Sequence, residues 1–308
     1  MPAFYPASSS LLSRLVPARL GQLGFCLVLV SLFLSLSGQL VRAQRLTAGT
    51  NYSLGIHPDG TLWAWGANTY GQLGDGSYNE QHVPVQIGTA TWRSVSAGAT
   101  HTVAIRQDGT LWAWGDSGNG QVGTGGYGFY PAPVQIGGAT WKYVSAGTNY
   151  TLAVRTDGTL WTWGANAAMG TGTSQNSPTQ VGTATTWQSV AAGRWHSAAV
   201  RTDGTLWTWG TNSSGQLGTT ATRDTPGQVG TATTWRSVAV GEYFTVATRQ
   251  DGTLWTWGQN YYGQLGDGTS NTAAHPTPTQ VGTATTWQNI AAGNAFTVAT
   301  RTDGTLWA

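Results

Sequence analysis

The chain has 308 residues, including 44 Gly and 17 Trp, and only 8% of its residues are charged. This apolar and aromatic content supports a large core and excludes an intrinsically disordered chain. Gly, Thr and Trp at fixed spacing predict many short strands joined by tight turns.

The first 43 residues differ in composition from the rest. Arg14 and Arg19 precede a largely apolar run from Leu23 to Leu36, and Val41-Arg42-Ala43 follows a short polar segment. This order is typical of a secretory signal peptide, so we predict residues 1–43 as a leader cleaved after Ala43. The protein is then expected to be secreted, whether periplasmic, cell-surface or extracellular. The alternative is an uncleaved anchor, for which a membrane-spanning helix needs about 20 apolar residues.

Loss of this leader would change the chemistry of the chain. The only cysteine, Cys26, lies within it, so the mature chain would hold no disulfide and no thiol nucleophile. Three of the 14 Lys and Arg residues lie there too, which leaves 11 basic against 12 acidic residues. A balance this close to zero provides no basic stripe for phosphates, so nucleic acid is not an expected partner.

A short motif, Asp-Gly-Thr-Leu-Trp, recurs through the remainder of the chain. Its copies are 46 to 52 residues apart and begin at Asp59, Asp108, Asp157, Asp203, Asp251 and Asp303. Asp-Gly favours a two-residue type I′ hairpin turn with positive φ at both positions. The residues after it are β-branched and aromatic, as expected for a packed strand.

Each repeat predicts four strands. In the second repeat they are 92–98, 101–106, 111–115 and 133–137, with a Gly-Gln-Val-Gly element (Gly-Gln-Leu-Gly in the first, fourth and fifth repeats) before the fourth. The fourth strand starts at Pro133, which suits an outer edge where no ladder bond is lost. One such unit cannot bury both of its faces, whereas radial stacking of units does. The sequence therefore predicts an all-β fold, a β-propeller of four-stranded blades over residues 44–308.

The repeats resemble the regulator-of-chromosome-condensation repeat family, which includes the α-tubulin-suppressor-like proteins. The residues that carry the resemblance are Gly98-Ala99-Thr100-His101-Thr102 and the segment from Trp65 to Gly74. The third copy departs from the pattern at 167–170, where we expect one altered turn. The resemblance implies a seven-bladed ring. Because six repeats are visible and the sixth is incomplete, we expect the sequence to be a truncated part of a longer product; atypical terminal repeats are the alternative.

Few residues in this pattern indicate catalysis. The six hairpin Asp residues share one turn position, which favours a structural role over paired catalytic acids. His101 and His196 occupy a position that other copies fill with Tyr52, Tyr150, Phe244 and Phe296, so a packing role is favoured. His57, His82 and His275 are isolated in loops. Asp75 and Asp267 in Gly-Asp-Gly segments only weakly resemble calcium loops. We predict no enzyme activity, no cofactor and no metal.

Residues that vary between repeats are better candidates for binding. The pair after the first-strand glycine is richest in two neighbouring blades, where it reads Arg194-Trp195 and Glu242-Tyr243. A second variable set surrounds the Gly-Gln-Leu-Gly element and comprises Tyr70, Tyr127, Phe129, Tyr130, Tyr261 and Tyr262. We expect these residues to bind a protein, since Trp, Tyr and Arg are enriched at binding hot spots. Carbohydrate stacked on exposed aromatics is one alternative, and ordinary loop packing of the second set is another. The family resemblance also implies guanine-nucleotide exchange on a small GTPase, which an exported chain would not meet.

Overall fold

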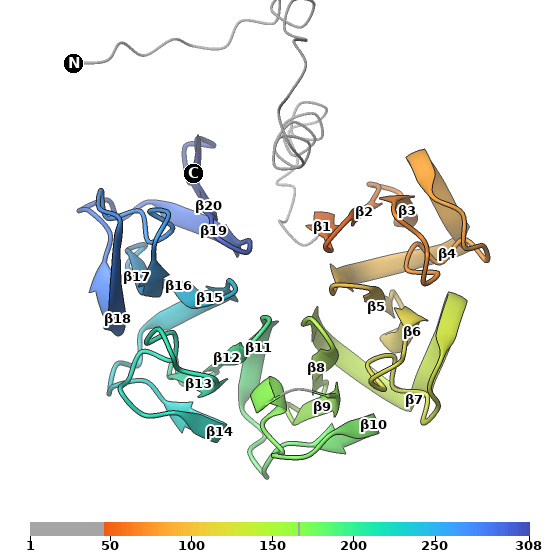
Figure 1. The fold of residues 1–308 in the computed structure, drawn as a ribbon, viewed down its shortest axis with the longest axis horizontal. Helices are drawn as coiled ribbons and strands as arrows, with labels where there is room; N and C mark the ends of the chain where they lie inside the picture. Colours follow the sequence, from red (N-terminus) through yellow and green to blue (C-terminus); the bar gives the residue numbers. More distant parts are fainter. Residues whose placement is uncertain (1–45, 166) are drawn as a thin grey trace, which may run out of the picture. The chain divides into compact units, whose positions relative to one another are not determined.

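The computed structural model describes residues 46–165 and 167–308 (Figure 1). The predicted leader and its cleavage site lie outside the described residues. The unit from Arg42 to Ala308 contains a series of antiparallel sheets, here called blades, placed around a common axis (Figure 1). No helix in the described ranges is long and apolar enough to cross a membrane.

The blades follow one another in chain order, and each adds its strands from the inside outward. The first three blades contain β1 (Leu46–Ala48), β2 (Tyr52–Ile56), β3 (Thr61–Gly66), β4 (Gln81–Ala97), β5 (His101–Arg106), β6 (Thr110–Asp116), β7 (Phe129–Ala146), β8 (Tyr150–Arg155), β9 (Leu160–Gly164) and β10 (Gln175–Gln180). A 3-10 helix, η2 (Ala167–Met169), lies between β9 and β10. Blades 4, 5 and 6 contain β11 (Trp187–Ala192), β12 (His196–Arg201), β13 (Leu206–Gly210), β14 (Arg223–Gln228), β15 (Trp235–Val240), β16 (Phe244–Arg249), β17 (Leu254–Asn260), β18 (Asn271–Gln280), β19 (Trp287–Ala292), β20 (Thr297–Arg301) and β21 (Leu306–Trp307).

The β-propeller of four-stranded blades is confirmed. Blades 1 to 5 each have four strands, and the described part of blade 6 has three. The altered turn expected in the third repeat is η2, where Met169 is buried in the position that Leu occupies elsewhere. A ring of seven blades stays a prediction.

Two of the strands are longer than predicted. We expected the outer strand of one blade and the inner strand of the next to be separate, but β4 and β7 each run through both. In β4, Gln81–Thr91 pairs with β3 and Trp92–Ala97 pairs with β5. Four residues (88–91) lie between Ile87 and Trp92, and the strand is continuous there. Five residues (182–186) lie between Val181 and Trp187, and the strand is interrupted there, as it is in the later blades.

The hairpin turn also differs from the prediction. Gly158 N–H donates to Arg155 O at 3.0 Å and Arg155 N–H donates to Thr159 O at 3.0 Å. These bonds define a three-residue loop, in which a type I turn is followed by a left-handed glycine, Gly158 with φ +82°. The two-residue type I′ turn was therefore wrong. Asp-Gly suits both turns, and loop length decides between them.

The Asp of each hairpin anchors a chain of hydrogen bonds that reaches the core. Asp157 Oδ1 accepts from Thr159 N–H at 2.9 Å and from Thr159 Oγ1 at 2.6 Å, and Trp161 Nε1 donates to Thr159 Oγ1 at 2.8 Å. Arg155 covers the Trp161 ring at 3.5 Å from its centroid. The Thr159 hydroxyl and then its backbone N–H lower the pKa of Asp157. All six copies make these three bonds, so the predicted structural role is supported.

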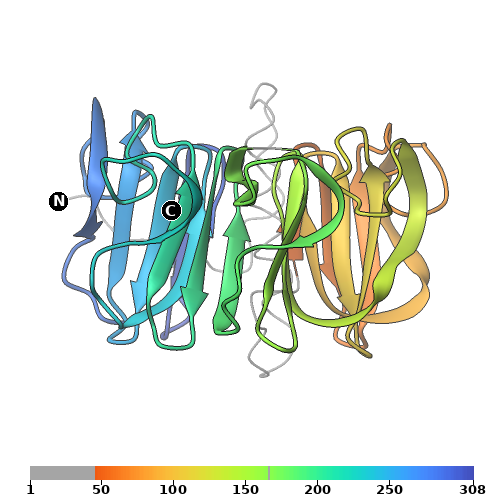
Figure 2. The same ribbon diagram turned by 90° about the horizontal axis from the view of Figure 1, so that it is seen from below.

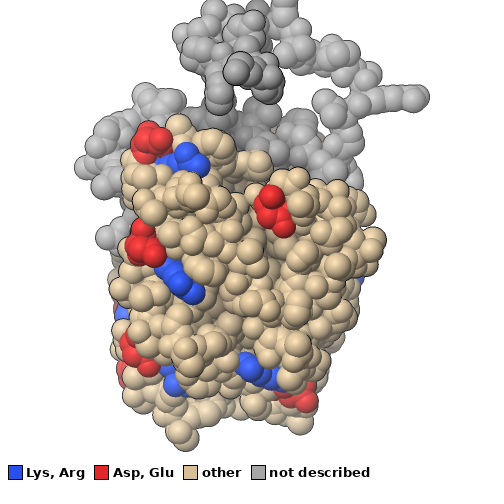
Figure 3. Space-filling view, turned by 90° about the vertical axis from the view of Figure 1, so that its left-hand side faces the viewer, with Lys and Arg blue, Asp and Glu red and all other residues tan. Residues whose placement is uncertain are grey.

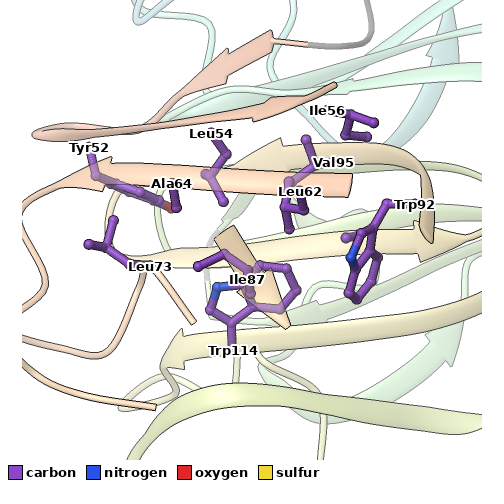
Figure 4. Close-up of a cluster of buried hydrophobic side chains, with 11 residues drawn as sticks. Tyr52, Leu54, Ile56, Leu62, Ala64, Leu73, Ile87, Trp92, Val95 and Trp114 are labelled. Atoms are coloured by element: carbon purple, nitrogen blue, oxygen red, sulfur yellow. The ribbon is translucent and has the colours of Figure 1, made fainter. Parts of the chain in front are cut away.

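The core lies between neighbouring blades. At the first such interface, Trp114 of blade 2 packs against Ile87 and Trp92 and beside Leu62 and Leu73 (Figure 4). The rings of Trp92 and Trp114 are 5.7 Å apart. Clusters built of similar aliphatic and aromatic residues recur at the following interfaces, so each blade buries its apolar faces against its neighbours.

Candidate functional site

The candidate residues lie where the inner strand of each blade turns into the second strand. Because the strands are antiparallel, this turn and the loop after the third strand lie on one face of the propeller, here called the loop face (Figure 2). The hairpins lie on the opposite face. Backbone bonds hold the two loops together, for example from Gln259 N–H to Tyr243 O at 2.9 Å.

The structure brings four predicted site residues together, from two blades. Arg194 Nη1 is 2.9 Å from Glu242 Oε1. The rings of Trp195 and Tyr243 stack, with centroids 6.5 Å apart and planes 24° apart. Arg194 also lies over the Trp195 ring, at 5.1 Å from its centroid. We call these four residues the loop-face patch.

The patch sits on a fixed backbone but remains open to solvent. Thr211 N–H donates to Trp195 O at 2.9 Å, and Glu242 N–H donates to Asn294 O of blade 6 at 3.3 Å. The side chain of Arg194 is 49% exposed and that of Glu242 is 22% exposed. An ion pair this exposed contributes little to stability. The patch therefore offers a charged pair and an aromatic pair for contact with a ligand.

Tyr261 and Tyr262 were predicted to belong to the binding surface. They follow β17 on the same face and are 49% and 77% exposed. Among the residues that the structure describes, neither side chain forms a hydrogen bond or a ring contact with Trp195, Glu242 or Tyr243. Both remain candidates for the rim of the patch, since they belong to the same blade as Tyr243.

The other variable aromatics have different roles. Tyr70 packs on Phe129 of the next blade, with centroids 5.4 Å apart. Tyr130 and Thr124 share a hydroxyl hydrogen bond of 2.7 Å. Tyr127 is 67% exposed. Loop packing, the alternative weighed from the sequence, accounts for Tyr70, Phe129 and Tyr130.

His101 and His196 are fully buried, as expected for a packing position. Sequence reasoning missed their polar role: each ring also binds the next blade. His101 Nε2 lies 3.0 Å from Thr151 Oγ1, and His196 Nε2 lies 2.8 Å from Thr245 Oγ1. Burial lowers the pKa of both imidazoles to about 3, so they are neutral at physiological pH. The sequence contains the information for these bonds. In the next repeat, the residue after the position equivalent to the histidine is a hydroxyl residue, here Thr151 and Thr245.

The weak calcium signals have structural explanations. Asp75 accepts hydrogen bonds from Ser77 N–H at 2.9 Å, from Gln81 Nε2 at 2.9 Å and from Asn68 Nδ2 at 3.1 Å. Asp267 accepts from Thr269 and Asn260 in the same way. Their oxygens are thus engaged by donors rather than arranged around a cation. In the part of the chain that the structure describes, no group of three or more His, Cys, Asp or Glu could hold a metal ion.

Charged side chains are sparse on the surface. Figure 3 shows them scattered singly or beside one another on an otherwise uncharged flank. Besides Arg194–Glu242, the ion pair found among the described residues is between His57 and Asp59, at 3.2 Å. His57 occupies the position that Arg155 and its equivalents hold in the later blades. The loop-face patch is therefore unusual in joining charges from two blades.

Comparison with known families identifies the repeat. A model of the regulator of chromosome condensation (RCC1) repeat matches residues 59–105, 108–154, 157–200, 203–248 and 251–300. A second model of the same repeat matches 44–72, 92–121, 141–168, 187–216 and 235–264. Together the matches extend over most of the described chain.

Solved structures show the same fold. Prp20p from Saccharomyces cerevisiae is similar with a TM-score of 0.73 and 22% identity, over 82% of this chain and 67% of that one. The same yeast protein bound to Kap60 gives a TM-score of 0.74 and 22% identity, over 82% and 65%. Human WBSCR16 gives 0.72 and 22%, over 82% and 70%. At this identity the likeness shows the fold alone.

Proposed function

Because the chain belongs to the regulator of chromosome condensation (RCC1) repeat family, we propose that it is a non-enzymatic β-propeller that binds a protein partner through its loop face. The observation that carries the proposal is the loop-face patch. Arg194, Trp195, Glu242 and Tyr243 do not repeat in other blades, yet they contact one another across two blades. Loop residues that differ between repeats, on a rigid scaffold, are where a specific function is expected.

The chemistry of the patch favours a protein over other ligands. Stacked aromatic rings supply apolar contact at low entropic cost, and an exposed ion pair can exchange partners with charges on a protein. Two of the similar structures point the same way: Prp20p is described with its binding to Gsp1p and histones, and it is also seen bound to Kap60. By analogy, a propeller of this family is a surface for protein contacts.

We further propose that the protein acts outside the cytoplasm, after removal of residues 1–43. This rests on the order of basic, apolar and small residues in that segment. An exported chain would not act on a nuclear GTPase, so nucleotide exchange is not our proposal. Mass spectrometry of the protein recovered from the native host tests it. A mature N-terminus at Gln44 supports cleavage and export, an intact Met1 in the membrane fraction supports the uncleaved anchor, and an intact Met1 in the cytoplasm contradicts export.

The binding proposal is tested with purified protein as bait against secreted and surface proteins, beside a glycan array. The double variant Trp195→Ala/Tyr243→Ala should lose the captured protein, because it removes the stacked pair. The control is Thr50→Ala/Asn51→Ala, which changes two exposed residues of blade 1 in the same loop, at the positions equivalent to Arg194 and Trp195. Equal capture by both variants would show that the loop-face patch is not the site. Binding to glycans in place of a protein would favour the carbohydrate alternative.

A further inference from the structure

The loop-face patch already holds one guanidinium group, that of Arg194. Its Nη1 lies 2.9 Å from Glu242 Oε1 of the next blade, and its central carbon lies 5.1 Å from the centroid of the Trp195 ring. A cation within about 6 Å of a ring centroid is attracted to the face of that ring. Glu242 and Trp195 therefore form a site for a guanidinium, and Tyr243, stacked on Trp195, extends its aromatic wall.

Arg194 is exposed enough to be displaced from this site. Its side chain is 49% exposed, and that of Glu242 is 22% exposed. An ion pair between exposed side chains shifts an equilibrium about fivefold at most. Glu242 stays in place when the pair opens, because its backbone N–H donates to Asn294 O at 3.3 Å. An arginine side chain from another molecule can therefore replace Arg194 at small cost.

The charge of the loop face favours a basic ligand. Among the residues that the structure describes, this face has two basic residues, Arg194 and Arg223. It has six acidic residues, which lie in the inner turns, in the loops after the third strands or at the start of an outer strand: Asp75, Glu80, Asp116, Asp224, Glu242 and Asp267. The net charge of the described loop face is therefore −4.

The hairpin face has the opposite balance. Arg106 and its four equivalents end the second strands there, and Arg93, Lys142 and Arg236 lie at the starts of inner strands. These eight basic residues exceed the six hairpin Asp residues, so the described hairpin face has a net charge of +2. A protein with faces of opposite sign attracts and orients a charged partner before contact. A basic partner is therefore directed to the loop face.

We propose that the loop-face patch binds an arginine side chain of a basic protein, which takes the place of Arg194. The proposal rests on the protein-binding function proposed above and names the chemistry of the partner. The incoming guanidinium donates to the Glu242 carboxylate and stacks on the Trp195 ring, so Arg194 acts as an internal competitor. Arginine fits better than lysine, because a planar guanidinium can pair with a carboxylate and also stack on an aromatic ring.

The test uses the full chain and the peptide acetyl-Gly-Arg-Gly-Arg-Gly-amide, with binding measured by saturation-transfer NMR. We expect saturable binding that weakens as the salt concentration rises, because salt screens exposed charges. The same peptide with citrulline in place of arginine keeps the shape without the charge and should not bind. The lysine peptide should bind more weakly than the arginine peptide.

Substitution of Arg194 separates this proposal from a general effect of charge. Arg194→Ala removes the internal competitor, so the arginine peptide should bind about two- to fivefold more tightly. Arg223→Ala is the matched control: it removes the other arginine of the same face, whose Nη1 donates to Gln228 O at 3.0 Å, and should change the affinity less. Glu242→Gln removes the carboxylate and should weaken binding about fivefold or more.

The proposal is overturned if the arginine peptide does not bind saturably, or if the citrulline or lysine peptide binds equally well. It is also overturned if Arg194→Ala leaves binding unchanged or weakens it, since Arg194 would then not compete. Equal gains from Arg194→Ala and Arg223→Ala would show that only the net charge of the face acts.

Two further results separate this proposal from its alternatives. Capture of a protein that requires Trp195 and Tyr243, without binding of the arginine peptide, would overturn the arginine and leave the proposed function in place. Self-association of the unchanged protein that the arginine peptide reverses would show that the arginine comes from a second copy of the chain, which would overturn a separate basic partner.

Discussion

At the scale of single residues, the most repeated side chains hold the hairpins in place. Each Asp accepts from the hydroxyl and the N–H of the Thr two residues later, and that hydroxyl accepts from the indole of a Trp. The acid therefore fixes the turn, and the Thr connects the turn to the aromatic layer. A carboxylate that accepts these two hydrogen bonds holds the turn, which supports a structural role for the six acids.

Thr159→Val should destabilise the protein by about 1 to 2 kcal/mol, because it leaves Trp161 Nε1 without its acceptor and removes one donor to Asp157. Valine keeps the shape of threonine, so the loss measures the hydroxyl. Urea unfolding followed by circular dichroism gives the free energy. Thr159→Ser keeps the hydroxyl and should remain close to the original protein. If the two variants are equally stable, the hydrogen-bond chain does not contribute.

Buried imidazoles should make stability depend on pH. Burial lowers the pKa of His101 and His196 to about 3, below their ordinary value of 6.5. The unfolded chain therefore binds more protons below pH 6.5, and stability is complete above that pH and is lost as the pH falls toward 3. The slope approaches about 1.4 kcal/mol per pH unit for each histidine.

The double variant His101→Tyr/His196→Tyr should flatten this dependence, since Tyr52 and Tyr150 occupy the equivalent positions in other blades. Urea unfolding at several pH values between 7 and 5 measures it. The hairpin carboxylates do not interfere, because hydrogen bonds from Thr lower their pKa from 3.8 and their contribution is lost only at more acid pH. Parallel curves for the two proteins would refute the prediction.

At the scale of elements, the sequence predicted the strands well and their junctions less well. Trp92–Gly98, His101–Arg106 and the Leu-Trp-x-Trp segment fall on the observed strands because alternation and aromatic content determine which residues face the core. The turn type and the merging of strands in β4 and β7 were missed. Both depend on a single residue of loop length, to which the hydrophobic pattern is insensitive.

The length of the link between blades should determine how much a substitution of the hairpin glycine lowers the free energy of unfolding. Gly109 and Gly204 occupy the same hairpin position with φ +85° and +75°. A Cβ on Gly109 would lie 3.4 Å from Thr140 Cβ, beside a four-residue link. A Cβ on Gly204 would lie 2.0 Å from Thr233 O, beside a five-residue link.

Gly109→Ala should therefore cost about 1 to 2 kcal/mol, the strain of a left-handed alanine. Gly204→Ala carries the same strain and must also displace the backbone of the link, so we expect it to cost about 2 kcal/mol more. Thermal unfolding of the two variants, compared with the unchanged protein, measures the difference. Equal melting temperatures would mean that the link moves without cost.

At the scale of the whole molecule, the loop-face patch shows what sequence can and cannot predict. The loop-face patch was predicted, because equivalent positions of successive blades lie side by side on one face. That its aromatic rings stack and its charges pair needed the structure.

Because each blade contacts only its neighbours, the stability of the molecule should depend on every interface being filled. Trp257→Ala empties the site between blades 4 and 5 and should cost about 3 to 5 kcal/mol. Loss of this contact uncouples blades 1 to 4 from blades 5 and 6, so the unfolding transition should broaden or split. Free indole should raise the melting temperature of the Trp257→Ala variant and leave that of the original protein unchanged, because indole can fill the space that the substitution empties. A melting temperature of the variant that does not respond to indole would show that the interface closes over the space.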